Sequence, residues 1–477
     1  MYRFRPIENL LEKYNELENQ EIYFASPEEL NDPIEGFRDI YWKGDSIIWK
    51  NLLKQYLRCL EHIFSLVLIL GEDKKLYWKD IPIHINSLKF PTKEYKAIFD
   101  EILNVFFKSK FFKNLPNDLA KRTNPVRRDE LLSYFKLVHP FAIETISEVY
   151  RNYQLLPKQT KRKDHLDEFK KILERAGSIV LLTNKLEKEP SVKDKKNIAE
   201  IFFSITNMVG SEVQLINQYE NSEIELNSNR YFLLSDFPEQ FLQSLESMIY
   251  PNWFSASFMS ECTNSSVWGH YGQNHKGVCL IFEADKKGDI ESLELDTENG
   301  YSSGSGATKA MVPHKFHKIR YENKHVEIDF FKSLARAPKY QLMAQWYTDE
   351  FGNKSICGEH LDNNIDEWRN AYWEKFIDSL IVKLDDWKYE NEYRLIINDN
   401  FIDFNSIEKR KLKYDFSSLK GIIFGIKTSN ADKIKILRII EKKCKENSRK
   451  EFEFYQAYYS KENGKIETKR LNLMQFE

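Results

Sequence analysis

The chain has 477 residues, enough for two or three domains or for one elaborated domain with a large insertion. Hydrophobic residues make up 42% of it and aromatic residues 14%, which excludes a protein that is disordered throughout. Lysine and arginine number 71 against 73 aspartate and glutamate, a formal net charge of −2, so no overall positive field favours nucleic acid.

Neither a disulfide framework, a zinc site nor a membrane anchor is expected. The five cysteines are scattered without a CxxC pair, and His314-x-x-His317 lacks a third ligand at zinc-like spacing. The N-terminus is too charged for a signal peptide, and the longest apolar stretch, Ile63–Leu70, is far shorter than the ~20 residues that cross a bilayer. We therefore expect a cytoplasmic protein that does not enter a membrane.

Residues 1–45 predict a strand, a helix, a second strand and a turn. In chain order these elements lie at Tyr2–Arg5, Ile7–Leu17, Glu21–Ser26 and Asn31-Asp32-Pro33. Alternation along the first strand places Arg3 and Arg5 on one face. Two such arginines can bind a phosphate through paired hydrogen bonds, although a short edge strand also carries arginines without any function.

Residues 46–245 predict a mainly helical insertion. Apolar residues recur at helical spacing over Ile47–Leu70, Tyr95–Phe107 and Asn197–Tyr219, and polar loops separate these segments. Ser178–Thr183 differs, because this apolar, β-branched run follows Gly177 and favours a buried strand. The insertion offers a surface for a protein partner.

Residues 246–477 predict a return to β structure. Strands are expected at Trp253–Met259, Val278–Glu283, Ile319–Tyr321, Lys388–Ile397 and Gly421–Ile426, helices at Glu327–Ala335, Asp366–Lys383 and Asp432–Lys445, and a mobile loop at Tyr301–Met311. Together with residues 1–45, this part predicts a discontinuous α+β core domain with a split mixed or antiparallel sheet, which residues 46–245 interrupt.

The segment Lys388–Ile397, KYENEYRLII, is the most informative for chemistry. A strand period of two places Glu390, Glu392 and Arg394 on one face. Closely spaced carboxylates in a dry cleft can have split pKa values or stabilise a developing cation. The alternative is a solvated strand face on which the arginine pairs with its neighbours.

A second group of candidates lies between Trp253 and Phe282. Ser255 and Ser257 share one strand face and form a polar shelf, while Phe254, Ala256 and Phe258 face the core. Trp268 and Tyr271 carry rings suited to stacking on a planar ligand, although their spacing of three also fits an ordinary packed helix.

The sequences of these segments and their order in the chain resemble the bacterial family catalogued as domain of unknown function 2971. The matching segments are YRF, IYFASPEELNDPIEG, FSAS, VWGHYGQNHKGVCLIFE, HKIRY, WKYENEYRLI and LKGIIFGIKTS. They cover the two ends of the chain and leave roughly residues 45–245 outside, so the insertion is an elaboration that the resemblance does not explain. The family label implies no reaction.

The chain is also similar, more weakly, to the ADP-ribosyltransferase fold of the R-S-E type. That resemblance implies that Arg3 holds NAD, that Ser255 or Ser257 supports the nicotinamide ribose, and that Glu390-x-Glu392 ends in the catalytic residue, Glu392. An aromatic wall, Trp268 or Tyr271, would hold the nicotinamide. FSAS departs from the usual serine-threonine-serine motif of that fold.

Three functions remain open. The first is an NAD-consuming enzyme that transfers ADP-ribose to a protein or nucleic-acid acceptor or hydrolyses NAD, as a toxin-like effector in phage defence. The second is a metal-dependent nuclease in which Asp32, Glu390 and Glu392 bind magnesium, although Tyr393 and Arg394 stand where an ExK motif needs its lysine. The third is a non-catalytic sensor or partner-binding protein whose Glu and Arg segments only build the core.

Overall fold

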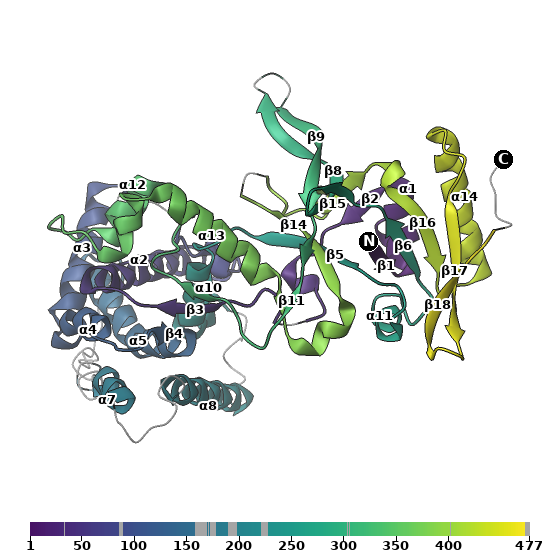
Figure 1. Cartoon of the computed structure of the whole chain (residues 1–477). Coiled ribbons are helices and arrows are strands. Elements are labelled where there is room, and N and C mark those ends of the chain that lie inside the picture. Colours follow the sequence, from purple (N-terminus) through teal and green to yellow (C-terminus); the bar gives the residue numbers. More distant parts are fainter. Residues whose placement is uncertain are drawn as a thin grey trace. The chain divides into compact units, whose positions relative to one another are not determined.

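The computed structural model describes residues 1–32, 34–84, 89–157, 169, 171, 178–188, 198–220, 228–302, 304, 306–400 and 402–472. Helices occur together with mixed sheets, which confirms the α+β class (Figure 1). Within these residues no helix combines the length and the apolar character needed to cross a bilayer.

The chain divides into two compact units, and each draws on separate stretches of sequence. Unit 1 consists of Met1–Phe37, Pro251–Val326 and Phe376–Glu477, and unit 2 of Arg38–Tyr250 and Glu327–Lys375. The domains expected from sequence, 1–45 with 246–477 and 46–245, stay a prediction. The units differ from them in one substantial way, because Glu327–Lys375 belongs to unit 2.

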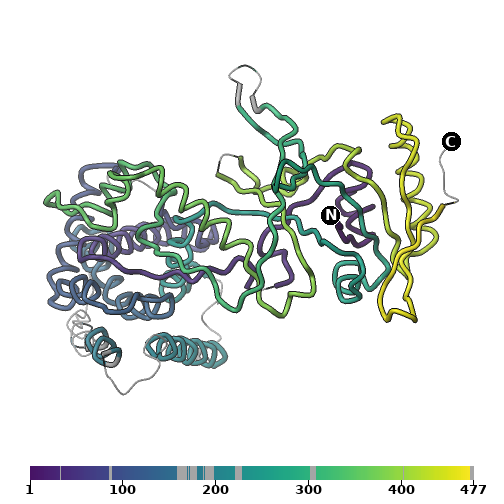
Figure 2. The backbone as a smooth tube through the Cα atoms, in the orientation of Figure 1, coloured from purple at the N-terminus to yellow at the C-terminus, as the bar shows by residue number. Residues whose placement is uncertain are grey.

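Unit 1 is built on an eight-stranded sheet in the order β10-β14-β5-β1-β6-β16-β17-β18. The strands are β1 (Tyr2–Arg5), β5 (Trp253–Met259), β6 (Val278–Phe282), β10 (His317–Lys318), β14 (Glu392–Asn398), β16 (Leu419–Phe424), β17 (Glu453–Ser460) and β18 (Lys465–Arg470). Neighbours are antiparallel except β16 and β17. The N-terminal strand therefore lies between strands from the middle of the chain (Figure 2).

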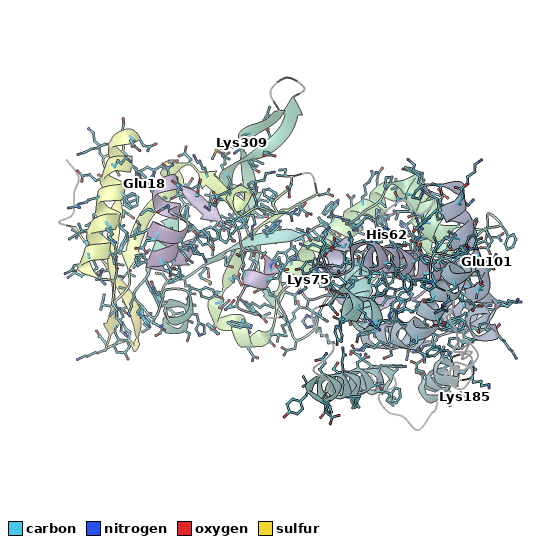
Figure 3. All side chains as sticks on the ribbon, turned by 180° about the vertical axis from the view of Figure 1, so that it is seen from behind. Glu18, His62, Lys75, Glu101, Lys185 and Lys309 are labelled. Carbon is cyan, nitrogen blue, oxygen red and sulfur yellow. The ribbon has the colours of Figure 1, made fainter. Side chains whose placement is uncertain are left out.

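One face of this sheet carries the main core of unit 1. Phe254, Ala256 and Phe258 of β5 point into it, as their alternation predicts, and Leu395 of β14 joins them. Helix α14 (Asn430–Glu446) adds two isoleucines to the same core, and the Ser429 side chain caps its first turn. On the short helix α1 (Glu16–Asn19), Glu18, which is labelled in Figure 3, accepts a hydrogen bond from Lys442 at 2.7 Å.

A second sheet of unit 1 corrects the loop expected at Tyr301–Met311. Its strands are β2 (Glu21–Tyr23), β15 (Lys411–Tyr414), β8 (Ile290–Ser302) and β7 (Asp285–Lys287), and β9 (Gly306–Lys315) pairs with β8. Most of the predicted loop is thus an antiparallel hairpin, because cross-strand pairing from Ser292 to Ser302 outweighs the weak strand preference of the small residues. The shorter elements of unit 1 are α11 (Ser265–His270), β11 (Arg320–Tyr321) and β13 (Val382–Lys383).

Unit 2 is mainly helical, in agreement with the predicted pattern of apolar residues. Its longer helices are α2 (Ser46–Leu70), α3 (Lys93–Lys108), α4 (Lys110–Ala120), α5 (Arg128–Asn152), α7 (Ser178–Lys188), α8 (Ile198–Glu220) and α10 (Phe237–Glu246). Short helices α9 (Asn229–Tyr231) and α12 (Lys339–Leu342) and a small sheet of β12 (Glu327–Asp329), β3 (Asp39–Trp42) and β4 (Val126–Arg127) complete it. Tyr56 of α2 stacks on Phe135 of α5 with ring centroids 4.7 Å apart.

The strand predicted at Ser178–Thr183 is wrong, because the segment begins helix α7. Val180, Thr183 and Glu187 are buried at helical spacing, and the two leucines between them are about half exposed. Glu187 forms a buried ion pair with Arg122 at 2.7 Å. The pattern thus repeats with the period of a helix once residues beyond Thr183 are counted.

The helix predicted at Glu327–Ala335 is also wrong, because no residue of this segment is helical. Residues 327–329 form β12, which pairs in parallel with β3, and Ile328 and Phe330 are both fully buried, with the period of a strand. The helix expected at Asp366–Lys383 is α13 (Ile365–Leu380). The last two residues of the predicted helix, Val382 and Lys383, instead form β13, so helical periodicity does not place the side chain of Lys383.

Gly425, which follows β16, should not tolerate a side chain. A Cβ at this position would lie 2.4 Å from the carbonyl oxygen of His275 and 2.7 Å from that of Gly277. Because backbone has to move to make room, we expect Gly425→Ala to lower the free energy of unfolding of unit 1 by about 1–3 kcal/mol in urea titrations. Gly269→Ala is the control, since a methyl group at that position would meet no atom within 4 Å. Equal unfolding midpoints for the two variants would contradict this packing.

Candidate functional site

A cavity of about 510 Å³ opens in unit 1 where β1 and β5 diverge. In the described chain these two strands are joined by one residue pair, Tyr2 with Met259. A hollow of this size falls in the range of small-molecule sites. Its lining residues are Arg3, Phe4, Arg5, Tyr23, Ala25, Glu29, Leu30, Asn31, Glu35, Ser255, Ala256, Ser257, Met259, His270, Tyr271, Lys383, Trp387 and Glu392.

Most of the residues predicted to form a site meet at this cavity. Arg3, Ser255, Ser257, Tyr271 and Glu392 all line it, although they are separated by up to several hundred positions in the chain. The sheet order explains their convergence, because β14, β5 and β1 are consecutive neighbours.

Two predicted residues lie elsewhere. Trp268 is fully buried in a core cluster, with its ring edge-on to Phe4 at 4.9 Å and its indole N–H donating to the Cys262 carbonyl at 2.7 Å. Its ring is therefore used in packing. Glu390 stands behind the lining, where its Oε1 accepts a hydrogen bond from the Tyr271 hydroxyl at 2.8 Å.

Glu392, at the first residue of β14, is held by two cations. Arg394 donates to it through Nε at 2.8 Å and through Nη2 at 2.9 Å, a two-pronged contact that fixes the plane of the carboxylate. Lys383 Nζ lies 3.4 Å from the same group. Arg394 also donates to the Leu380 carbonyl at 2.8 Å and pairs with Glu35.

Lys383 connects the two glutamates of the ExE segment. Its Nζ donates to Glu390 Oε2 at 2.9 Å and lies 4.5 Å from the centre of the Trp387 ring. Tyr271, bonded to the other oxygen of Glu390, accepts a hydrogen bond from Asn31 at 3.1 Å. An aromatic wall of the cavity is thereby fixed to the charged residues beneath it.

The buried ion cluster, which we define as Glu35, Lys383, Glu390, Glu392 and Arg394, carries more negative than positive charge. All five side chains are at most 2% exposed. Three carboxylates against two cations leave one net negative charge when every group is ionised. Such a cluster favours an additional positive charge, either a proton or a cation that develops on a bound molecule.

Burial raises the pKa of Glu392 to about 7. Lys383 opposes this shift, Glu390 adds to it, and a hydrogen bond from Ser257 lowers the pKa again. Burial also lowers the pKa of Arg394, with Asp32 opposing, but the guanidinium keeps its charge at neutral pH. The proton that the cluster can gain is therefore exchanged near neutral pH.

The common strand face predicted for Glu390, Glu392 and Arg394 is wrong for Glu390. Residues Asp385–Glu390 form a tight helical turn, Asn391 has a φ of 46°, and the strand begins only at Glu392. Asparagine tolerates this left-handed conformation better than most residues. The turn brings Glu390 beside Glu392 through Lys383 instead of through strand alternation.

Arg3 reaches the cavity from the other face of the sheet. Strand pairing sets Glu392 opposite Met259 and Arg394 opposite Ser257, whereas Arg3 stands opposite Leu280 and 5.4 Å from the Phe258 ring. Its Nη2 donates to the Tyr23 carbonyl at 3.0 Å, and burial lowers its pKa.

Several buried polar atoms of the lining residues, Arg5 Nε among them, have no hydrogen-bond partner among the described residues. Two of these atoms, Arg3 Nε and Ser255 Oγ, belong to residues that are 3% and 2% exposed. Buried polar groups are almost always hydrogen-bonded in folded proteins. Both atoms are therefore suited to bind a polar molecule in the cavity.

The residues assigned to a nuclease do not gather as metal ligands. Asp32 Oδ1 accepts the Ile34 amide at 3.1 Å in a turn whose Pro33 lies outside the described residues. In the part of the chain that the structure describes, no three His, Cys, Asp or Glu residues are grouped as metal ligands. The oxygens of Glu390 and Glu392 face Lys383 and Arg394.

Sequence reasoning missed three residues of the site. Glu35 and Lys383 belong to the buried ion cluster, and Trp387 lines the cavity in the place where Trp268 was expected. Trp387 and Glu35 both lie inside the segments that carry the family resemblance. Lys383 sat at the end of a predicted helix, so no periodicity linked it to the glutamates.

One comparison with known proteins matches a stretch of the chain that includes part of this cavity lining. Residues 267–395 match the model of a family described as Protein of unknown function (DUF2971). The match confirms the resemblance over a stretch that contains Tyr271, Lys383, Glu392 and Arg394. No curated protein and no solved structure matches the chain.

Proposed function

We propose that unit 1 binds NAD in this cavity and cleaves the bond between nicotinamide and ribose, as an ADP-ribosyltransferase or an NAD hydrolase with an ADP-ribosyltransferase-like sheet. The observation that supports it is the meeting of Arg3, Ser255, Ser257 and Glu392 around one cavity of about 510 Å³. Sequence order alone suggested these roles, and the geometry adds the two unpartnered atoms and the net charge of the buried ion cluster.

The lining offers groups for each part of such a ligand. Arg3 supplies positive charge and a free N–H for a phosphate or ribose, and Ser255 supplies a free hydroxyl. The rings of Tyr271 and Trp387 offer faces for the nicotinamide.

The chemistry assigned to Glu392 is electrostatic. When nicotinamide leaves with the bonding electron pair, positive charge develops on the ribose, and a fixed carboxylate in a buried site stabilises it. An acceptor oxygen or nitrogen, or water, then forms the new bond to the ribose carbon and releases its proton. Arg394 and Lys383 position the carboxylate, and Glu35 and Glu390 keep the cluster negative.

The cellular role that we propose is that of a toxin-like effector, active in the cytoplasm against phage. Purified protein incubated with nicotinamide-labelled NAD should release nicotinamide, and adenine-labelled NAD should distinguish transfer to a protein or nucleic-acid acceptor from hydrolysis. Expression in cells should lower the NAD pool. If candidate acceptors stay unlabelled and NAD stays intact in both assays, the proposal is wrong.

The rate of nicotinamide release should rise with pH through about 7. Glu392 has to be ionised to stabilise positive charge, and its pKa is raised to about 7.

The stability of unit 1 should change with pH in the opposite direction to the rate of nicotinamide release. A carboxyl whose pKa is above its ordinary value of 4.5 stabilises the fold at low pH, and this contribution is lost as pH rises through about 7. Profiles of kcat/KM and of urea unfolding against pH check both signs, and a rate that falls across pH 7 would contradict the assignment.

A further inference from the structure

Helix α8 of unit 2 directs some of its polar side chains toward the rest of the unit, while others are exposed. Asn207 donates to the Asp129 carbonyl of α5 at 2.9 Å, and Gln214 donates to the Ser235 hydroxyl at 2.9 Å. Of the apolar residues along α8, Phe203 and Ala199 are buried. Hydrogen bonds and the packing of these two apolar residues therefore attach the helix to the rest of unit 2, while most of its other apolar residues are exposed.

The opposite side of α8 is a mainly apolar surface, interrupted by Glu212, which we call the outer face. Its members are between 48% and 90% exposed, and they are Ile201, Phe202, Ile205, Met208, Val209, Val213, Leu215, Ile216 and Tyr219. With ~200 Å² for a free large side chain, they present on the order of 1000 Å². A monomer rarely exposes a contiguous apolar patch of more than a few hundred Å².

The outer face repeats every seven residues. The columns are Ile201, Met208 and Leu215; Phe202, Val209 and Ile216; and Ile205, Glu212 and Tyr219. A seven-residue apolar repeat is what keeps one side of a helix in register with another helix over several turns. The pattern therefore indicates a helix as the partner.

The charge of α8 indicates whether the partner of its outer face is a membrane surface or a protein. The helix contains Glu200, Glu212 and Glu220 but no lysine or arginine. Helices that lie on membranes are typically rich in lysine and arginine on their polar face, so anionic lipid is disfavoured. The outer face of a second copy of this chain is a suitable partner for the first, because it is equally apolar and has the same seven-residue repeat.

We infer that the outer face of α8 is a dimer interface, covered by the outer face of α8 in a second copy of this chain. The two helices run antiparallel, since a parallel pair would place the two Glu212 carboxylates beside each other. The exposed area is comparable to the ~800 Å² that each partner contributes to a standard interface. Two-fold dimers of this kind are the commonest oligomers.

The oligomeric state of the full-length protein tests the inference. Analytical ultracentrifugation over a range of concentrations should show a dimer, and Met208→Lys and Ile216→Lys should each raise its dissociation constant at least ~100-fold. Ile69→Lys is the matched control, because Ile69 is 77% exposed on α2, outside the outer face. Circular dichroism should show unchanged helix content in all three variants. A wild type that is monomeric throughout, or a dimer that survives both α8 substitutions, overturns the proposal.

Cross-linking tests the direction of the helices. The natural cysteines are buried, so a cysteine introduced at the surface acts as a specific reporter. Under mild oxidation Met208→Cys, near the middle of α8, should cross-link, whereas Tyr219→Cys, near its end, should not. Efficient cross-linking at Tyr219 would show that the antiparallel arrangement is wrong. If the protein is a monomer and binds vesicles of phosphatidylcholine and phosphatidylserine through α8, the outer face contacts a membrane surface and the proposed dimer is wrong.

Discussion

Replacing Glu392 with glutamine should reduce nicotinamide release from NAD by on the order of 10³-fold, because removal of one group that stabilises the charge of a transition state costs about this much. The amide has nearly the same shape as the carboxylate but no charge, so it cannot stabilise positive charge on the ribose. Release of labelled nicotinamide, measured at saturating NAD, gives the ratio of the two rates. Binding of NAD, measured by calorimetry, should change much less than the rate does.

Two further variants make this result specific. Glu390→Gln should have a smaller effect, since Glu390 stands behind the cavity and acts through Tyr271 and Lys383. Glu283→Gln should have no effect, because Glu283 is an exposed residue paired with Lys420 at 2.5 Å. If Glu392→Gln lowers thermal stability yet leaves every NAD-dependent signal intact, Glu392 is a core residue and the protein is a sensor or binding protein instead.

The sequence predicted the framework of the site more accurately than its chemistry. The bounds of β1 and β5 agree with the prediction, because each is a short alternating run whose apolar residues have one face to bury. The same alternation correctly placed Ser255 and Ser257 opposite the core. It could not show that β14 and β1 flank β5, which depends on pairing between distant segments.

Local periodicity failed where long-range contacts determine the structure. Glu390 leaves the predicted strand because Asn391 adopts a left-handed conformation, and Lys383 leaves the predicted helix because β13 pairs with β11. Glu35 meets Arg394 through a contact between residues far apart in the chain. No period in the sequence connects these three residues, so the buried ion cluster was visible in the sequence only as the ExE segment and its arginine.

Substituting Arg394 with leucine should destabilise unit 1 by about 3–5 kcal/mol at neutral pH. The change removes both hydrogen bonds to Glu392 and the ion pair with Glu35, and it leaves three carboxylates against one cation in a buried site. The free energy of unfolding, measured by urea titration, gives the size of the loss. Arg320→Leu is the control, because Arg320 is 43% exposed in its pair with Asp378 and a surface ion pair contributes ~1 kcal/mol or less.

The pH dependence of this loss separates a charge effect from a packing effect. Without the positive charge of Arg394 the protonated form of the buried carboxyls is favoured, so their pKa values rise further in the folded protein. The destabilisation by Arg394→Leu should therefore shrink as pH falls, since protonated carboxyls need no cation. A loss that stays constant with pH would mean that the leucine fits poorly and that charge is not the cause. A second substitution, Glu392→Leu, should then restore part of the stability only if charge imbalance is the cause, because it removes one of the unpaired carboxylates.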